Sequence, residues 1–137
     1  MKTQQINSWG FSSTSFWLTG LIAIGIVFIG SRFIIMPNVG AEGFGIPLLS
    51  NKQATAYGWI KGIWDIYSGV TLLIFLILRK RRATAFVFAA AIIIPVSDFF
   101  TILSVNGAED VQHLLIHGLT AVYMIITTIL LFKAPKN

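Results

Sequence analysis

The chain has 137 residues, of which 55% are hydrophobic and only 11% are charged, and it contains no cysteine. A soluble domain of this size has too little interior to bury that much apolar surface, so the composition excludes a water-soluble protein and predicts one embedded in a lipid bilayer. The absence of cysteine excludes thiol catalysis, disulfide bonds and thiolate metal sites. The net charge of +5 does not indicate nucleic-acid binding, because four of the ten basic residues form one run at 79–82 between two apolar stretches.

Four apolar stretches are long enough to cross the hydrocarbon core of a bilayer, which takes about 20 helical residues. They cover residues 14–36, 54–78, 83–105 and 111–132. We therefore predict an all-α protein, an integral membrane four-helix bundle that forms a single membrane domain over residues 1–137.

The distribution of Lys and Arg predicts how the bundle is oriented. If the 79–82 loop is cytoplasmic, both termini are cytoplasmic as well, and seven of the ten basic residues lie on that side, in agreement with the positive-inside rule. Trp9 and Trp17 then fit the cytoplasmic aromatic belt, and Tyr57 and Trp59 fit the outer one. We expect the cytoplasmic membrane of a bacterium as the location and leave open whether the chain forms a homo-oligomer.

Charged residues inside the first two spans need an explanation, because each charge at the bilayer centre costs roughly 2.5 to 3.5 kcal/mol. The first span carries Arg32, and the second carries Lys61 and Asp65, which are four residues apart and share a helix face. Gly58 and Gly62 form a small-xxx-small spacing, which lets the backbone of another helix approach this part of the second span.

The third and fourth spans also carry polar residues. Pro95 lies in the middle of the third span and predicts a bend, because proline releases a backbone carbonyl of the preceding turn. Asp98 and Thr101 follow the proline directly, and His113 and His117 are four residues apart on the fourth span.

The ionisable residues of the four spans all lie at the midplane of the bilayer or on the same side of it. Counting a rise of about 1.5 Å per residue from each midpoint gives distances toward the outer side of roughly 0 Å for Asp65, 6 Å for Asp98, 7 Å for Lys61 and His117, and 10 Å for Arg32. Random scatter would rarely collect them all at the midplane or in the outer half. We therefore predict a polar pocket, neutral overall, in the outer half of the bundle.

Each of these residues also has a structural interpretation. The charged pair of the second span can lock that helix to its neighbours, and Arg32 can extend to the outer headgroups. His113 is more typical of the membrane interface than of a ligand site. Trp64 and Tyr67 can line the pocket or pack against lipid.

The stretches "GFGIP", "KGIWD", "PVSDF" and "HLLIH" give the chain a resemblance to a known group. From about residue 30 to about residue 123, the sequence resembles the four-span membrane proteins of domain of unknown function 4267, and more loosely the DoxX-like membrane proteins. The resemblance implies a loop motif from Gly43 to Pro47 after the first span, but no established reaction. It implies these characteristic polar positions: Lys61, Gly62, Asp65, Gly69, Pro95, Asp98 and His117. Trp64 stands where such families often carry a basic residue, which argues against a second cation beside Asp65.

Three classes of function are open at this point. The first is a membrane enzyme or binding protein for a lipophilic small molecule. Asp65 and Asp98 would be its acid and base, with His117 as proton shuttle and Lys61 or Arg32 as electrostatic stabiliser. Isomerisation, cyclisation or epoxide opening suits carboxylates in a dry pocket. The candidate ligand contacts are Arg32, Trp64, Tyr67, Thr101 and His113.

The second class is a proton- or cation-coupled transporter, for which so short a chain would need to dimerise. The inner half offers only hydroxyl groups, which weakens that interpretation. The third class is a non-catalytic membrane partner protein, in which the polar cluster specifies helix packing. His113 and His117 with two aspartates could form a mixed metal site, but no metal-binding or cofactor motif supports it, and we predict neither a metal nor a cofactor.

Overall fold

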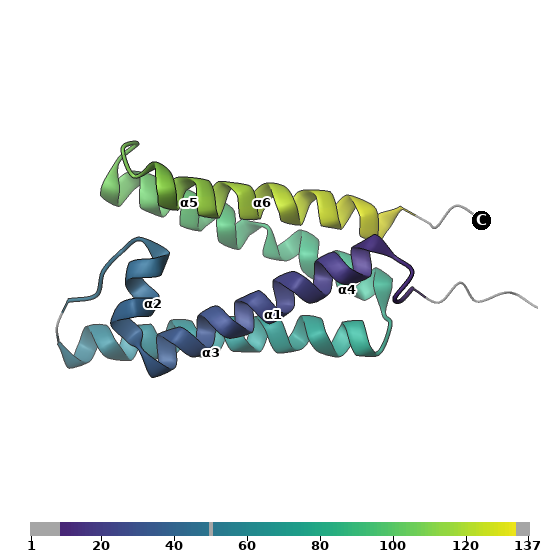
Figure 1. Cartoon of the computed structure of the whole chain (residues 1–137), viewed down its shortest axis with the longest axis horizontal. Helices are drawn as coiled ribbons and strands as arrows, with labels where there is room; N and C mark the ends of the chain where they lie inside the picture. The colour runs from purple at the N-terminus through teal and green to yellow at the C-terminus, as the bar shows by residue number, and fades with distance from the viewer. Residues whose placement is uncertain (1–8, 50, 134–137) are drawn as a thin grey trace, which may run out of the picture.

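The computed structural model describes residues 9–49 and 51–133, which form six helices and no strand (Figure 1). The helices are α1 (Thr14–Ile35), α2 (Pro37–Phe44), α3 (Lys52–Ile77), α4 (Arg81–Ala91), α5 (Ile93–Asn106) and α6 (Val111–Phe132). Among the described residues, four segments are long and apolar enough to cross a membrane: α1, α3, the continuous stretch Arg81–Asn106 and α6. The prediction of an all-α bundle with four spans is confirmed, and each span begins and ends within two residues of the predicted limits.

The third span is bent where Pro95 predicts a bend. Its helix is interrupted at Ile92, which separates α4 from α5. Proline has no N–H to donate to the carbonyl of Ala91 one turn earlier, and its ring crowds that carbonyl. The interruption therefore lies in the turn before the proline, and α5 leaves it in a new direction.

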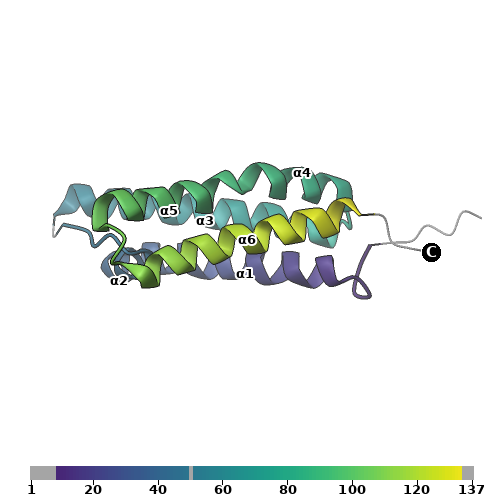
Figure 2. The same cartoon turned by 90° about the horizontal axis from the view of Figure 1, so that it is seen from above.

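Two helix pairs make up the bundle. Helix α1 packs along α3, and α6 packs on α4 and α5, while packing between the pairs is less extensive and joins α1 to α6 and α3 to α4. Seen from above, α6 lies over α1 and α5 lies over α3 (Figure 2). The Tyr123 hydroxyl donates a hydrogen bond of 2.8 Å to the carbonyl of Leu18, which ties α6 to α1.

Glycines bring the backbones of α1 and α3 into direct contact. A Cβ atom added to Gly62 would lie 2.6 Å from the carbonyl oxygen of Gly30, and one added to Gly30 would lie 2.6 Å from the carbonyl oxygen of Gly62. One added to Gly69 would lie 2.6 Å from the carbonyl oxygen of Ala23. The contact therefore repeats every seven residues along both helices. The atoms nearest to a Cβ added at Gly58 belong to the side chains of Leu48, Pro37 and Phe33, so the backbone approach that the Gly58 and Gly62 spacing predicts occurs at Gly62.

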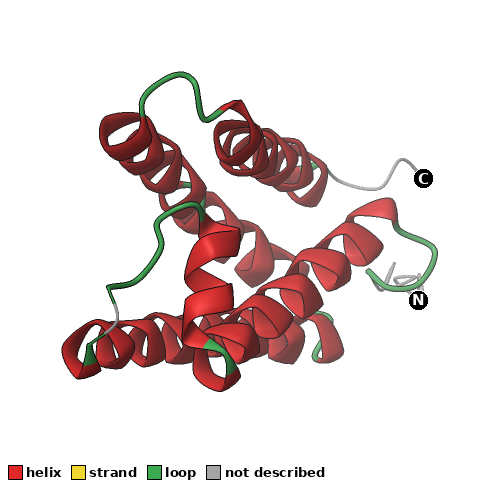
Figure 3. Ribbon diagram, turned by 60° about the vertical axis from the view of Figure 1, so that its left-hand side comes forward, coloured by secondary structure: helices red, strands yellow, loops and turns green. Residues whose placement is uncertain are grey.

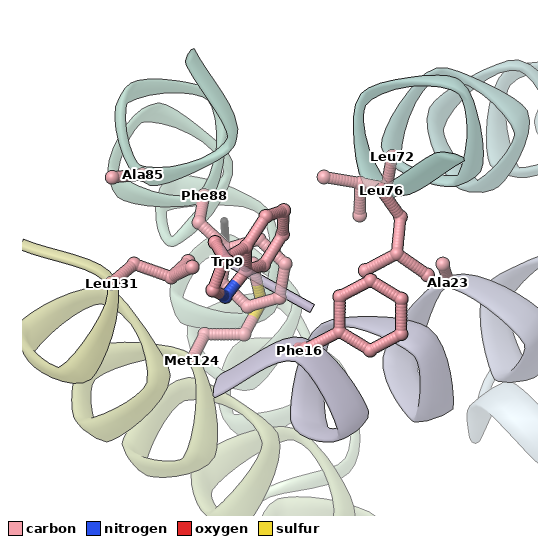
Figure 4. Close-up of a cluster of buried hydrophobic side chains, with 9 residues drawn as sticks. All are labelled: Trp9, Phe16, Ala23, Leu72, Leu76, Ala85, Phe88, Met124 and Leu131. Carbon is pink, nitrogen blue, oxygen red and sulfur yellow. The ribbon is translucent and has the colours of Figure 1, made fainter. Parts of the chain in front are cut away.

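The half of the bundle near the termini is filled by apolar side chains (Figure 4). They come from α1, α3, α4, α6 and the segment before α1: Trp9, Phe16, Ala23, Leu72, Leu76, Ala85, Phe88, Met124 and Leu131.

The prediction that Trp9 belongs to the cytoplasmic aromatic belt is wrong, because only 6% of this residue is exposed. Its indole Nε1 donates a hydrogen bond of 3.0 Å to the Ser15 hydroxyl, which satisfies the polar end of the ring inside the core. Trp17, Tyr57 and Trp59 are exposed, as belt residues should be.

The glycine contact between α1 and α3 leads to a stability prediction. We expect Gly62→Ala to lower the free energy of unfolding by about 1 to 3 kcal/mol, because the new methyl group meets backbone that cannot move aside easily. The matched control is Gly25→Ala on α1, where nothing lies within 4 Å of the added Cβ and the gain in helix propensity is up to about 1 kcal/mol. Unfolding by sodium dodecyl sulfate in mixed micelles measures both, and equal effects of the two substitutions would contradict the contact.

Candidate functional site

Between the first two spans the sequence predicts a loop, whereas the structure forms helix α2 there. Pro37 occupies its first turn, and Gly45 ends it in the left-handed conformation, with φ of 107°. A proline at the start and a glycine just past the end are helix signals, so the sequence did contain a cue. Helix α2 packs on α1 and α3 and lies between the two helix pairs (Figure 3). It therefore closes the end of the bundle that is opposite the termini.

The loop motif after α2 is fixed by the turn between α5 and α6. The Asn106 side chain donates a hydrogen bond of 2.7 Å to the carbonyl of Gly45. A Cβ atom added to Gly45 would lie 2.7 Å from His113 Cγ and 2.9 Å from Ile102 Cδ1. Position 45 thus requires glycine for both its backbone angle and its close approach to α5 and α6.

The imidazole of His117 is held by α2. Its Nε2 lies 3.0 Å from the carbonyl oxygen of Phe44, and the Phe44 ring packs edge-on against it, with 4.8 Å between ring centroids. A carbonyl oxygen only accepts hydrogen bonds, so Nε2 carries the proton. In the neutral ring, Nδ1 is therefore left as an acceptor.

Asp98 lies on the Nδ1 side of His117. Its Oδ2 atom is 3.8 Å from Nδ1, which is too long for a hydrogen bond. The carboxylate makes no hydrogen bond to any of the residues that the structure describes. Two acceptor groups from α5 and α6 therefore face each other without a proton donor between them.

Lys61 and Asp65 form a close ion pair on α3. Lys61 Nζ lies 2.7 Å from Oδ1 and 2.6 Å from Oδ2 of Asp65. The same ammonium lies 5.4 Å from the centroid of the Phe33 ring and 5.5 Å from that of the Phe44 ring, within the range of a cation–π interaction. The pair therefore contacts α1 and α2 in addition to its own helix.

A cavity of about 520 Å³ lies between the two helix pairs. Its floor includes Leu72 and Met124 of the packed half, and much of its remaining wall is aliphatic. Six of the nine predicted site residues line it: Arg32, Lys61, Asp65, Tyr67, Asp98 and His117. The roles assigned to these residues stay predictions.

The other three predicted site residues lie away from the cavity lining. Trp64 is 63% exposed and its ring packs edge-on against Tyr67. The Thr101 hydroxyl is exposed and donates to the carbonyl of Ser97 on its own helix. His113 Nδ1 lies 2.7 Å from Asp110 Oδ1 at the turn before α6.

Arg32 does not pair with Asp98. Its Nη2 atom donates a hydrogen bond of 3.3 Å to the carbonyl of Val39 in α2, while its side chain borders the cavity. Its position agrees with the prediction that Arg32 belongs to the pocket, and its role as a ligand contact stays a prediction. Arg32 also fastens α2 to the end of α1.

Sequence reasoning missed several lining residues. Ser68 and Thr71 of α3 continue the face of Lys61 and Asp65 at three- to four-residue spacing, so helical periodicity could have identified them. Phe44 and Ala91 could not have been found this way, because their positions depend on α2 and on the bend before Pro95.

The two histidines do not gather with the aspartates at one point. His113 contacts Asp110, whereas His117 faces Asp98 and Phe44. Across residues 9–49 and 51–133, no group of three or more His, Asp or Glu side chains is placed to hold a metal ion.

Comparison with known proteins gives one assignment. The family model described as Domain of unknown function (DUF4267) matches residues 23–131, which include α1 from Ala23 onward, α2 to α5 and nearly all of α6. The chain belongs to the DUF4267 family. No curated protein and no solved structure matches it. The cavity-lining residues of this DUF4267 protein all fall inside the matched range.

Asp110, at the turn before α6, leads to a pH prediction. Hydrogen bonds from the side chains of Asn106 and His113 hold the pKa of Asp110 below its ordinary value of 3.8. The ionised carboxylate therefore stabilises the fold above pH 3.8, and this contribution is lost as the pH falls through the lower folded-state pKa. We expect Asp110→Asn to lower the thermal unfolding temperature in detergent at pH 7, with the difference from the unmodified protein shrinking as the pH falls below 3.8. A difference that is the same at pH 7 and at the lowest pH would contradict this account.

Proposed function

We propose that this DUF4267 protein binds a lipophilic small molecule in the cavity between its helix pairs. The observation that carries the proposal is a cavity of about 520 Å³ whose mostly apolar lining also includes ionisable side chains from α1, α3, α5 and α6. Ligand pockets typically have volumes of about 300 to 1,000 Å³, apolar walls and a few convergent polar groups. Intramembrane charges are costly to keep, which favours a use for them beyond packing.

We further propose that Asp98 and His117 transfer protons on the bound molecule. The hydrogen bond to Phe44 fixes the imidazole with Nδ1 toward Asp98. A reacting group between the two can give a proton to one and receive a proton from the other. Lys61 and Asp65 are near enough for their charges to act on Asp98, so Lys61 is positioned as an electrostatic stabiliser.

The packed half of the bundle favours this proposal over a transporter. Nine apolar residues fill the bundle between the cavity floor and the termini. The polar side chains buried in that half are hydroxyls, among them Thr19, Thr84 and Thr127. A cavity that ends on a packed core suits a bound molecule better than a path across the membrane.

The proposed orientation places both termini in the cytoplasm of a bacterium and the cavity in the outer half of its cytoplasmic membrane. It is supported by the Lys and Arg distribution and by the position of the charged cluster at the end opposite the termini. In this orientation, the ligand enters from the outer leaflet or from the outer surface.

Filling the cavity tests whether a molecule occupies it. We expect Ala91→Phe to abolish retention of a co-purifying lipophilic molecule, because Ala91 lines the cavity and a benzyl group would occupy the same space. The matched control is Ala90→Phe, the neighbouring position, which is exposed on the helix surface and should retain the molecule. Native mass spectrometry of the purified variants measures retention. Equal retention by both variants, or none by the unmodified protein, would count against the proposal.

A substitution at Asp98 separates ligand binding from helix packing. We expect Asp98→Asn to leave the thermal unfolding temperature within a few degrees of that of the unmodified protein, because this carboxylate makes no hydrogen bond within the described chain. The same variant should lose most of its retained ligand in native mass spectrometry. If the cluster served only to specify packing, unfolding temperature would fall and no ligand would be lost.

A further inference from the structure

The side chains of Asp98 and His117 are spaced so that one ligand oxygen can contact both. Oδ2 of Asp98 and Nδ1 of His117 are 3.8 Å apart, so an oxygen atom beside both can lie about 2.8 Å from each, the usual length of a hydrogen bond. The carboxylate accepts hydrogen bonds only, and Nδ1 accepts in the neutral ring and donates in the charged ring. A hydroxyl group satisfies both side chains when the ring is charged, because it donates its hydrogen to the carboxylate and accepts from Nδ1; when the ring is neutral, its single hydrogen satisfies only one of the two acceptors.

The charges around the gap favour a neutral ligand group. The cavity lining contains two cations, Arg32 and Lys61, and two anions, Asp65 and Asp98. While the imidazole of His117 is neutral, their formal charges cancel, and Lys61 with Asp65 is already paired at 2.6 Å. A ligand carboxylate would meet the carboxylate of Asp98, while a ligand ammonium would leave an uncompensated positive charge in a site of low dielectric constant, and both are costly.

A route for an apolar chain leads from this gap to the lipid. Tyr67 of α3 and Ile94 of α5 both line the cavity, and they are 63% and 45% exposed. Packing between the helix pairs joins α3 to α4 and α1 to α6, and contact between α3 and α5 is at most marginal. The cavity therefore reaches the lipid-facing surface between α3 and α5, beside the bend that precedes Pro95.

Resting on the lipophilic-ligand function proposed above, we infer that the ligand is a long-chain alcohol whose hydroxyl group sits between Asp98 and His117. The hydroxyl donates to the Asp98 carboxylate and accepts from Nδ1 when the imidazole is charged. The apolar chain lies against the aliphatic wall of the cavity and extends between α3 and α5 into the bilayer.

A probe series on the unmodified protein tests the head group. The probes are a hexadecanol that carries a diazirine on its chain, its methyl ether, the corresponding amine and the corresponding carboxylic acid, applied to the full chain in lipid nanodiscs. After irradiation, labelled peptides are mapped by mass spectrometry and half-saturating concentrations are compared. We expect the alcohol to label cavity-lining peptides of α3 and α5 at a concentration at least about tenfold lower than the ether, because the ether has no hydrogen to donate to the Asp98 carboxylate.

Each result separates this inference from the function on which it rests. If the alcohol and the ether label the cavity equally, the cavity binds lipophiles without recognising a hydroxyl, and only the inference is overturned. Tighter labelling by the amine or the acid overturns the inference in favour of a charged head group. If no probe labels the cavity, both the inference and the proposed function fail.

Two variants locate the hydroxyl. Asp98→Asn should remove the advantage of the alcohol over the ether and leave labelling by the ether unchanged. The matched control is Thr101→Val on the same helix, whose hydroxyl bonds to the backbone of its own helix and does not line the cavity. This control should keep the full advantage of the alcohol. An advantage that persists in Asp98→Asn would overturn the placement of the hydroxyl at Asp98.

Discussion

Direct backbone contact between α1 and α3 determines how the rest of the bundle is arranged. Gly30 and Gly62 allow each helix to approach the carbonyl oxygen of the other, and Ala23 with Gly69 repeats the contact two turns away. In a bilayer, where lipid already solvates apolar side chains, such close packing is a main source of helix association. The contact holds α1 and α3 together as a tight pair, and the bent third span with α6 forms the second pair. Because the pairs are well packed only toward the termini, the cavity lies in the other half, with the ionisable residues on its wall.

The positions of the four spans and the bend could be predicted because they depend on local properties. Hydropathy over about 20 residues locates a span, and Pro95 removes a hydrogen bond from its own helix whatever surrounds it. The shared depth of Lys61, Asp98 and His117 also follows from counting residues along each helix. These quantities need no knowledge of which helix lies beside which.

The remaining features depend on neighbours that the sequence does not specify. Helix α2 is short and rich in glycine, and its contacts with α1, α3 and His117 position it. Trp9 has the residue type and position of a belt residue, yet the helices leave a space that it fills. Tyr67 borders the cavity and Trp64 does not, although both side chains are exposed to the same extent. Arg32 donates a hydrogen bond to a carbonyl of α2, a partner that hydropathy along the chain does not predict.

The hydrogen bond between Phe44 and His117 has a consequence for how the site tolerates mutation. The acceptor is the backbone carbonyl of residue 44, so any amino acid that preserves the path of α2 presents the same oxygen to the imidazole. Substitutions at position 44 change the packing against the ring without changing which nitrogen carries the proton. The tautomer is thus encoded by the course of the main chain, through Gly45 and its left-handed conformation, and not by the chemistry of the side chain at position 44.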